Sequence, residues 1–209
     1  MAIRQAFIRL FFLLECLVLM PIARVLLGMR VRGPRPRPDP KGIIVAPNHQ
    51  SWIDPLMVQY AVFPLRITFL MTELFFDLPV VGFYFRAAGA RPIREGGPSV
   101  AGMRASLEAL EEGEVICIFP EGELTQTGEL GEGQRGVARI ARRTGAAVLP
   151  VGVRGAINVF SKVQARPQLA RVEIRLGRPM RFEEEESAAG ERRFTKRLME
   201  RIRMLAYGE

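Results

Sequence analysis

Residues 42–55 read GIIVAPNHQSWIDP, and this stretch decides the expected fold. The β-branched run Ile43 to Ala46 favours a short buried strand. Asp54 followed by Pro55 is typical of a helix start, because aspartate caps free N–H groups and proline fits the first turn. The stretch therefore predicts a strand, a polar loop and a helix in direct succession.

The same alternation continues along the chain. Further strands are expected at 67–70, 115–119, 147–151 and 172–176, and helices near 54–63, 98–112, 134–144 and 191–206. Strands that alternate with helices predict an α/β fold with a mostly parallel sheet flanked by helices. Ligand sites in such sheets lie at the carboxyl ends of the strands, so the loops after residues 46 and 119 are expected to share a face.

The polar loop contains the only histidine of the chain, His49, five residues before Asp54. An imidazole can remove a proton from a hydroxyl group, and a nearby carboxylate can fix its tautomer and stabilise the imidazolium that forms. These residue types suit group transfer to an alcohol. The simpler alternative is that Asp54 serves only as a helix cap.

The spacing Asn48-His49-x-x-x-x-Asp54 resembles the glycerolipid acyltransferase family, which includes the lysophosphatidic acid acyltransferases. A second block, residues 119–125 (FPEGELT), resembles the family block Phe-Pro-Glu-Gly-Thr-Arg-Ser, whose glutamate and glycine shape the acceptor site. This sequence has Glu123 and Leu124 where the family has threonine and a phosphate-binding arginine. Because a carboxylate repels a phosphate monoester, an acceptor of the lysophosphatidylethanolamine type stays open beside lysophosphatidate.

Two further blocks complete the resemblance between about residues 42 and 155. Residues 89–94 (GARPIR) resemble the family segment that ends in a phosphate-binding arginine, and residues 148–154 (VLPVGVR) resemble the fourth block. The resemblance implies His49 and Asp54 as catalytic residues. It implies Asn48, Arg94, Glu121, Gly122 and Pro150 as substrate-binding residues.

The expected activity is transfer of a fatty acyl group to the free hydroxyl of a lysophospholipid, with His49 as general base. The resemblance implies acyl-CoA or acyl carrier protein as the donor. We expect no further cofactor, and no metal, since one histidine and no paired cysteines leave no zinc site. A CoA-independent phospholipid transacylase and a non-catalytic lipid-binding module are the alternatives.

The segment from Phe7 to Met29 is mostly apolar but contains two arginines, Glu15 and Pro21. A break at Pro21 would give a helical hairpin that enters one leaflet of a membrane; a signal peptide and a buried core helix are the alternatives. Residues 34–40 (PRPRPDP) predict an extended linker. We therefore expect a membrane-associated segment at 1–33, a linker at 34–41 and an acyltransferase domain at 42–209.

The net charge of +8 predicts an anionic partner. Membrane lipid is favoured over nucleic acid, because the basic residues lie beside apolar segments without the aromatic pattern of base stacking. The expected location is the cytoplasmic membrane, with the catalytic domain on the cytoplasmic face. The apolar stretch Leu74 to Phe85 predicts either an acyl-chain groove or ordinary core packing.

Overall fold

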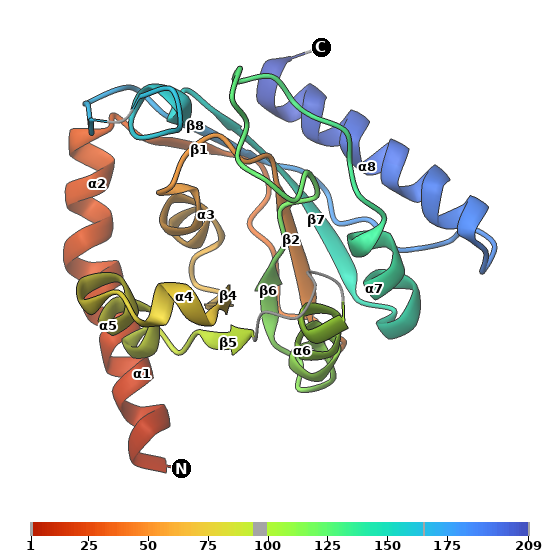
Figure 1. Cartoon of the computed structure of the whole chain (residues 1–209), viewed down its shortest axis with the longest axis horizontal. Coiled ribbons are helices and arrows are strands. Elements are labelled where there is room, and N and C mark those ends of the chain that lie inside the picture. The colour runs from red at the N-terminus through yellow and green to blue at the C-terminus, as the bar shows by residue number, and fades with distance from the viewer. Residues whose placement is uncertain (1, 94–99, 165, 209) are drawn as a thin grey trace.

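A six-stranded sheet forms the centre of the computed structural model, which describes residues 2–93, 100–164 and 166–208 (Figure 1). The strand order is β1-β8-β7-β2-β6-β3. The strands are β1 (Arg30–Arg32), β2 (Ile43–Pro47), β3 (Ile67–Thr68), β6 (Val115–Cys117), β7 (Ala147–Arg154) and β8 (Glu173–Leu176). All neighbouring pairs are parallel except β7 and β8, which confirms the mostly parallel sheet.

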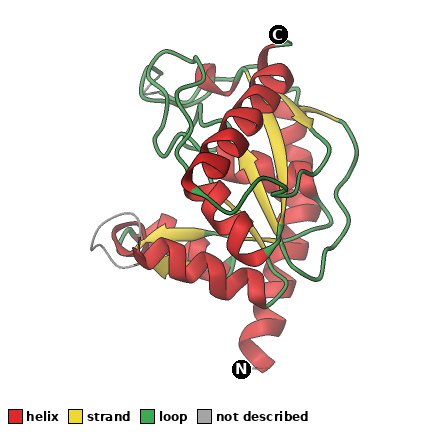
Figure 2. Cartoon of the chain, turned by 90° about the vertical axis from the view of Figure 1, so that its right-hand side faces the viewer, coloured by secondary structure: helices red, strands yellow, loops and turns green. Residues whose placement is uncertain are grey.

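Helices cover both faces of the sheet (Figure 2). One face packs on α3 (Asp54–Val62), and the other packs on α6 (Val100–Glu111), α7 (Gly136–Thr144) and α8 (Ala188–Tyr207). A short 3-10 helix, Ala156–Asn158, follows β7. Beside the main sheet, β4 (Leu70–Thr72) and β5 (Arg91–Ile93) form a second small sheet next to α4 (Glu73–Phe76) and α5 (Pro79–Ala87).

The last helix docks closely on the sheet. Phe194, Leu198 and Ile202 recur at helical spacing and are fully buried, as expected for an amphipathic helix that covers a sheet. Gly152 on β7 permits this approach, since a Cβ there would lie 2.3 Å from the backbone nitrogen of Ala206. The helix therefore ends directly above the carboxyl half of β7.

The N-terminal segment forms one continuous helix, so the predicted hairpin is wrong. It consists of α1 (Ala2–Leu14), a π-helical turn (Glu15–Leu19) and α2 (Met20–Leu26). In the π turn the Met20 N–H donates to the Glu15 carbonyl, five residues back, which widens the helix just before Pro21. The helix continues through Pro21, because the widened turn gives room to the proline ring, which would otherwise clash with the carbonyl four residues back.

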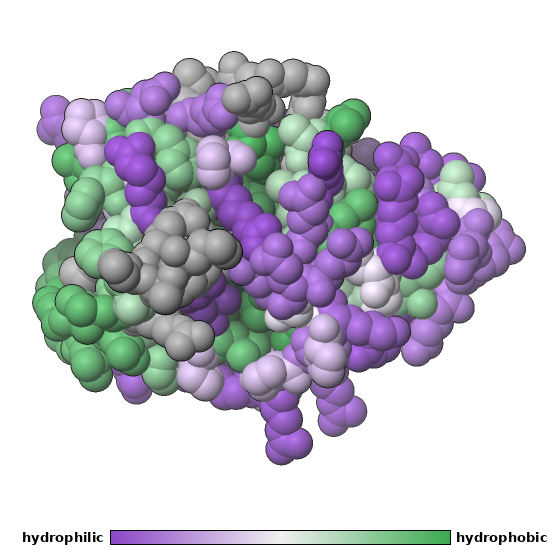
Figure 3. All heavy atoms as spheres, turned by 90° about the horizontal axis from the view of Figure 1, so that it is seen from below, coloured by the Kyte–Doolittle hydropathy of each residue, from purple (hydrophilic) through white to green (hydrophobic). Residues whose placement is uncertain are grey.

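This helix lies along the domain with one side buried and the other exposed. Ile8, Met20 and Leu27 are buried, whereas Leu17 and Val25 are 73% and 80% exposed. Residues Ala6–Leu26 are long and apolar enough to cross a membrane, with a mean hydropathy of 2.2, by length and composition alone. The surface seen in Figure 3 carries an apolar patch on the side of α1 and α5.

The stretch Leu74 to Phe85 divides between core and surface. Phe85 is buried and packs edge-on against Phe69, with ring centroids 6.0 Å apart. Phe83 is 63% exposed, and Tyr84 meets Phe11 of α1 at 5.7 Å. Part of this stretch therefore packs in the core and part supports the N-terminal helix.

Candidate active site

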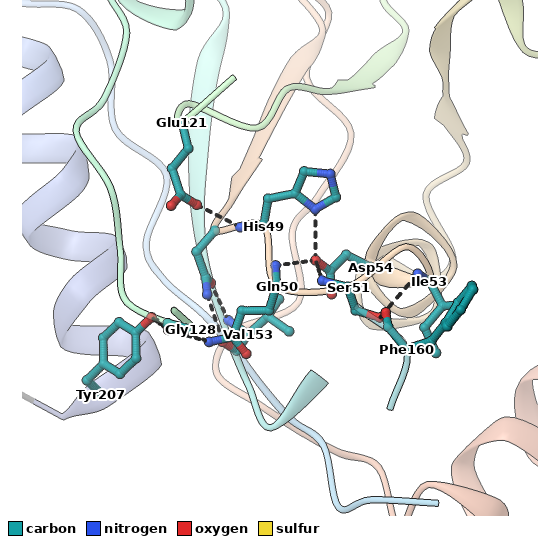
Figure 4. Close-up of polar contacts among 11 residues, drawn as sticks. His49, Gln50, Ser51, Ile53, Asp54, Glu121, Gly128, Val153, Phe160 and Tyr207 are labelled. Carbon is teal, nitrogen blue, oxygen red and sulfur yellow. Dashed lines mark hydrogen bonds and ion pairs between the residues drawn. The ribbon is translucent and has the colours of Figure 1, made fainter. Parts of the chain in front are cut away.

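His49 and Asp54 form a hydrogen-bonded pair at the carboxyl end of β2 (Figure 4). The loop after the strand carries His49, and Asp54 is the first residue of α3. His49 Nδ1 lies 2.9 Å from Asp54 Oδ2, which also accepts the backbone N–H groups of Gln50 and Ser51 at 2.6 and 2.7 Å. One carboxylate oxygen thus fixes both the imidazole and the turn that carries it.

The environment of the pair favours a defined histidine tautomer. Asp54 is fully buried, and burial raises the pKa of its carboxyl group, while the hydrogen bonds from His49, Ser51 and Gln50 act in the opposite direction. With Asp54 ionised, His49 Nδ1 carries the proton and Nε2 keeps a free lone pair. The His49 side chain is 17% exposed, so a substrate can reach it.

Phe119 stacks on the imidazole ring. The two ring centroids lie 3.8 Å apart and the planes differ by 19°. Phe119 is the first residue of the block at 119–125, and no role for its ring was predicted from the sequence. An aromatic face so close to an imidazole can stabilise a positive charge as it forms.

Glu121 joins the loop after β6 to the loop after β2. Its Oε1 accepts the backbone N–H of His49 at 2.8 Å, and its Oε2 accepts that of Gly131 at 2.8 Å. The Thr125 N–H donates to the His49 carbonyl at 2.9 Å. The two loops therefore do meet at one face, and Glu121 acts on the backbone of the histidine.

Gly122 occupies a position that requires glycine. Its φ is +80°, and a Cβ there would lie 2.2 Å from Gln134 Nε2. Its own N–H donates to the Phe119 carbonyl at 3.1 Å, which closes a tight turn. This amide is therefore committed to the turn.

Asn48 ties the end of β2 to β7. Its side-chain amide donates to the Val153 carbonyl at 2.9 Å and accepts the Val153 N–H at 2.7 Å, and Asn48 is 1% exposed. Pro150 lies within the same strand, buried and paired with Ala46 of β2. Asn48 thus lies beside the loop of His49, whereas Pro150 lies inside the sheet.

Two further side chains, Gln50 in the loop of His49 and Tyr207 at the end of α8, both bind Gly128, and the sequence did not predict these contacts. The Tyr207 hydroxyl donates to the Gly128 carbonyl at 2.7 Å, and Gln50 Nε2 donates to the same carbonyl at 3.1 Å. These contacts join residues far apart in the sequence, so no local pattern could have indicated them. The loop of His49 is therefore held from three sides.

The two residues that depart from the family block, Glu123 and Leu124, differ in burial. Glu123 is exposed, with a carboxylate oxygen 3.9 Å from Lys162 Nζ, whereas Leu124 is buried. Arg94 lies outside the described residues. Within the described part of the chain, no three His, Cys, Asp or Glu side chains gather as metal ligands would.

Known proteins resemble this chain in both sequence and fold. A family model described as acyltransferase matches residues 28–154. The 1-acyl-sn-glycerol-3-phosphate acyltransferase of Neisseria gonorrhoeae is 31% identical over 153 residues, which cover 72% of this chain and 58% of that protein. The Bacillus subtilis protein of the same name is 26% identical over 128 residues, which cover 61% of this chain and 63% of that protein.

The matched region thus spans about three fifths of the length of these relatives. A crystal structure of the 1-acyl-sn-glycerophosphate acyltransferase from Thermotoga maritima superimposes with a TM-score of 0.71. The alignment covers 95% of this chain and 78% of that one, at 23% identity. This similarity shows a shared fold.

Proposed function

Because the chain belongs to the acyltransferase family, we propose that it transfers a fatty acyl group from a thioester to the free hydroxyl of a lysophospholipid. The donor is acyl-CoA or acyl carrier protein. One observation carries the proposal: a buried carboxylate orients the only histidine of the chain in a loop clamped by Glu121. This is the arrangement that a general base for an alcohol requires.

The reaction moves one proton and replaces the carbon–sulfur bond of the thioester with a carbon–oxygen bond. His49 Nε2 accepts the proton of the lysophospholipid hydroxyl as its oxygen attacks the thioester carbonyl carbon. The carbon–sulfur bond breaks when the tetrahedral intermediate collapses, and the imidazolium returns the proton to the departing thiolate. Asp54 holds Nδ1 and stabilises the imidazolium between these steps, so no covalent acyl-enzyme is needed.

Lysophosphatidate is the acceptor we favour, because the named relatives act on 1-acyl-sn-glycerol-3-phosphate. Arg94 is our candidate for its phosphate. The exposed side chain of Glu123 has Lys162 nearby, and this cation offsets the repulsion that a carboxylate would exert on a phosphate. Lysophosphatidylethanolamine is the alternative acceptor, since Leu124 cannot bind a phosphate as the family arginine does.

We also propose that the protein lies on the cytoplasmic face of the membrane. The domain packs along the N-terminal helix, with contacts to Phe11 of α1 and to Arg24 of α2. A helix with a polar domain along its side fits an orientation in the plane of the membrane better than a crossing one. The two cysteines are unpaired, as is usual in the cytoplasm.

The test is release of free thiol from acyl-CoA and from acyl carrier protein with lysophosphatidate or lysophosphatidylethanolamine. His49→Ala should lower kcat by about 10²- to 10⁴-fold, the usual contribution of a general base. Thermal unfolding of the variant checks that it is still folded at the assay temperature. Acyl transfer without a thioester donor would favour the transacylase. Lipid binding with no thiol release that depends on His49 would favour a non-catalytic module.

A further inference from the structure

A set of exposed apolar side chains lies beside the catalytic loop and has no role in the chemistry above. We call this set, with two neighbouring cations, the rim: Trp52, Leu56, Val163, Arg166, Leu169 and Arg171. Val163 and Leu169 are 64% and 73% exposed, and Trp52, the only tryptophan of the chain, is 46% exposed. Exposed apolar side chains grouped in this way mark an interaction surface.

The rim is built onto the catalytic loop. The carbonyl of Phe160 accepts the Ser51 hydroxyl at 2.5 Å (Figure 4). The same carbonyl accepts the Trp52 N–H at 3.1 Å. The Ser161 hydroxyl then accepts the N–H groups of Val163 and Gln164 at 3.2 and 3.0 Å, which holds the turn that carries Val163. A partner that contacts Val163 therefore lies close to the turn that carries His49.

The rim also continues the exposed apolar side of the N-terminal helix. The Val172 N–H donates to the Leu27 carbonyl at 3.1 Å, so the end of the loop after β7 lies against the end of α2. A Cβ at Gly28 would lie 3.5 Å from Arg171 Cγ. In Figure 1 this loop, coloured cyan, lies beside the end of α2, where Val25 and Leu26 are exposed.

The charges of the rim suit an anionic lipid surface. Arg166 and Arg171 have no ion-pair partner among the described residues, and both are exposed. In a bilayer interface, negatively charged headgroups lie above the acyl chains. The unpaired arginines of the rim suit the headgroups, its exposed apolar side chains suit the acyl chains, and tryptophan is common between the two. An acidic protein with an apolar surface is the alternative partner, and a failure of the rim to enter vesicles would favour it.

We propose that the rim is a second membrane-contact surface, which inserts Val163, Leu169 and Trp52 into the headgroup region of an anionic bilayer. The N-terminal helix and the rim then lie on the same bilayer, and the catalytic loop faces the lipid surface from which a lysolipid comes. The inference rests on the proposed membrane location and is independent of the proposed acyl transfer.

Trp52 itself reports on the proposal. The full-length protein is mixed with phosphatidylcholine vesicles, with or without phosphatidylglycerol, and tryptophan emission is measured. Insertion predicts a shift of the emission to shorter wavelength, protection from acrylamide, and quenching by lipids brominated near the headgroup, all stronger with phosphatidylglycerol. The proposal is overturned if the protein binds the vesicles but Trp52 emits as it does in water. It is equally overturned if the protein does not bind the vesicles.

Matched variants test the apolar tips. Val163→Glu and Leu169→Glu should each weaken binding to anionic vesicles by about tenfold, since each removes the burial of one apolar side chain. Val100→Glu is the control, because Val100 is 75% exposed at the start of α6, at the other end of the sheet in Figure 1. Equal binding by all three variants overturns the proposal.

Thiol release measured on the same samples separates this inference from the proposed function. Insertion of Trp52 without thiol release refutes the proposed acyl transfer and supports the rim as a membrane-contact surface. Thiol release that depends on His49, with Trp52 in water, keeps the acyl transfer and refutes the rim.

Discussion

Replacement of Asn48 by alanine should destabilise the fold, because its side chain pairs with both backbone groups of Val153. The two hydrogen bonds, of 2.9 and 2.7 Å, are buried. Asn48→Ala leaves an N–H and a carbonyl of β7 without these partners at a site closed to water. At about 1–3 kcal/mol for each of the two unsatisfied groups, the loss is about 2–6 kcal/mol.

For a protein of this size, a loss of about 2–6 kcal/mol lowers the unfolding temperature by roughly 4–24 °C, at about 2–4 °C for each kcal/mol. Thermal unfolding followed by circular dichroism in detergent measures this directly. Asn158→Ala is the matched control, because Asn158 is the only other asparagine of the chain and is exposed. The control should unfold within about 1–2 °C of the wild type, as surface substitutions usually do.

The result also separates two roles for Asn48. If Asn48 only binds substrate, Asn48→Ala should raise KM and leave the unfolding temperature unchanged. If Asn48→Ala unfolds at the wild-type temperature, the reasoning from the Val153 pairing is refuted and the substrate-binding role moves ahead.

Three further changes have defined outcomes. Gly122→Ala should cost at least about 1–2 kcal/mol of stability, because φ is positive and the Cβ clashes, whereas Gly136→Ala, with open space around it, should cost less in the same melts. Phe119→Leu should lower kcat by about 2- to 30-fold in the thiol-release assay, through loss of the ring stacked on the imidazole; an unchanged kcat contradicts this. The hydrogen bond from Arg175 and the charges of Arg32 and Arg154 lower the pKa of Glu173. Ionised Glu173 therefore stabilises the fold at a pH above the ordinary glutamate range, and this stabilisation is lost as the pH falls through the lowered pKa. Urea titrations at several pH values should show this acid-dependent loss in the wild type and a smaller one in Glu173→Gln.

Sequence patterns predicted the parts of the fold that local chemistry determines. The strand Ile43–Pro47, the polar loop and the helix Asp54–Val62 follow one another as expected, and the last helix covers the sheet. The spacing of His49 and Asp54 could be read directly, because the loop between them is short. Their catalytic roles stay predictions.

Elements that depend on distant partners could not be predicted in this way. β1 has exposed arginines at both ends and β5 contains a proline, so neither carries the apolar signal of a strand. The contact of Asn48 with Val153 depends on which strands become neighbours. The divisions at residues 33 and 41 also stay predictions, and β1, before the first of them, already belongs to the main sheet.

The contact of Tyr207 with Gly128 has a consequence for the order in which the candidate site is completed during synthesis. During synthesis the apolar helix of α1 and α2 leaves the ribosome before Tyr207 does. The helix, which we propose to lie on a membrane, can therefore form while this support of the loop of His49 is still unmade. If the proposed membrane location holds, synthesis itself would then bring the helix to the lipid before the loop of His49 is completed.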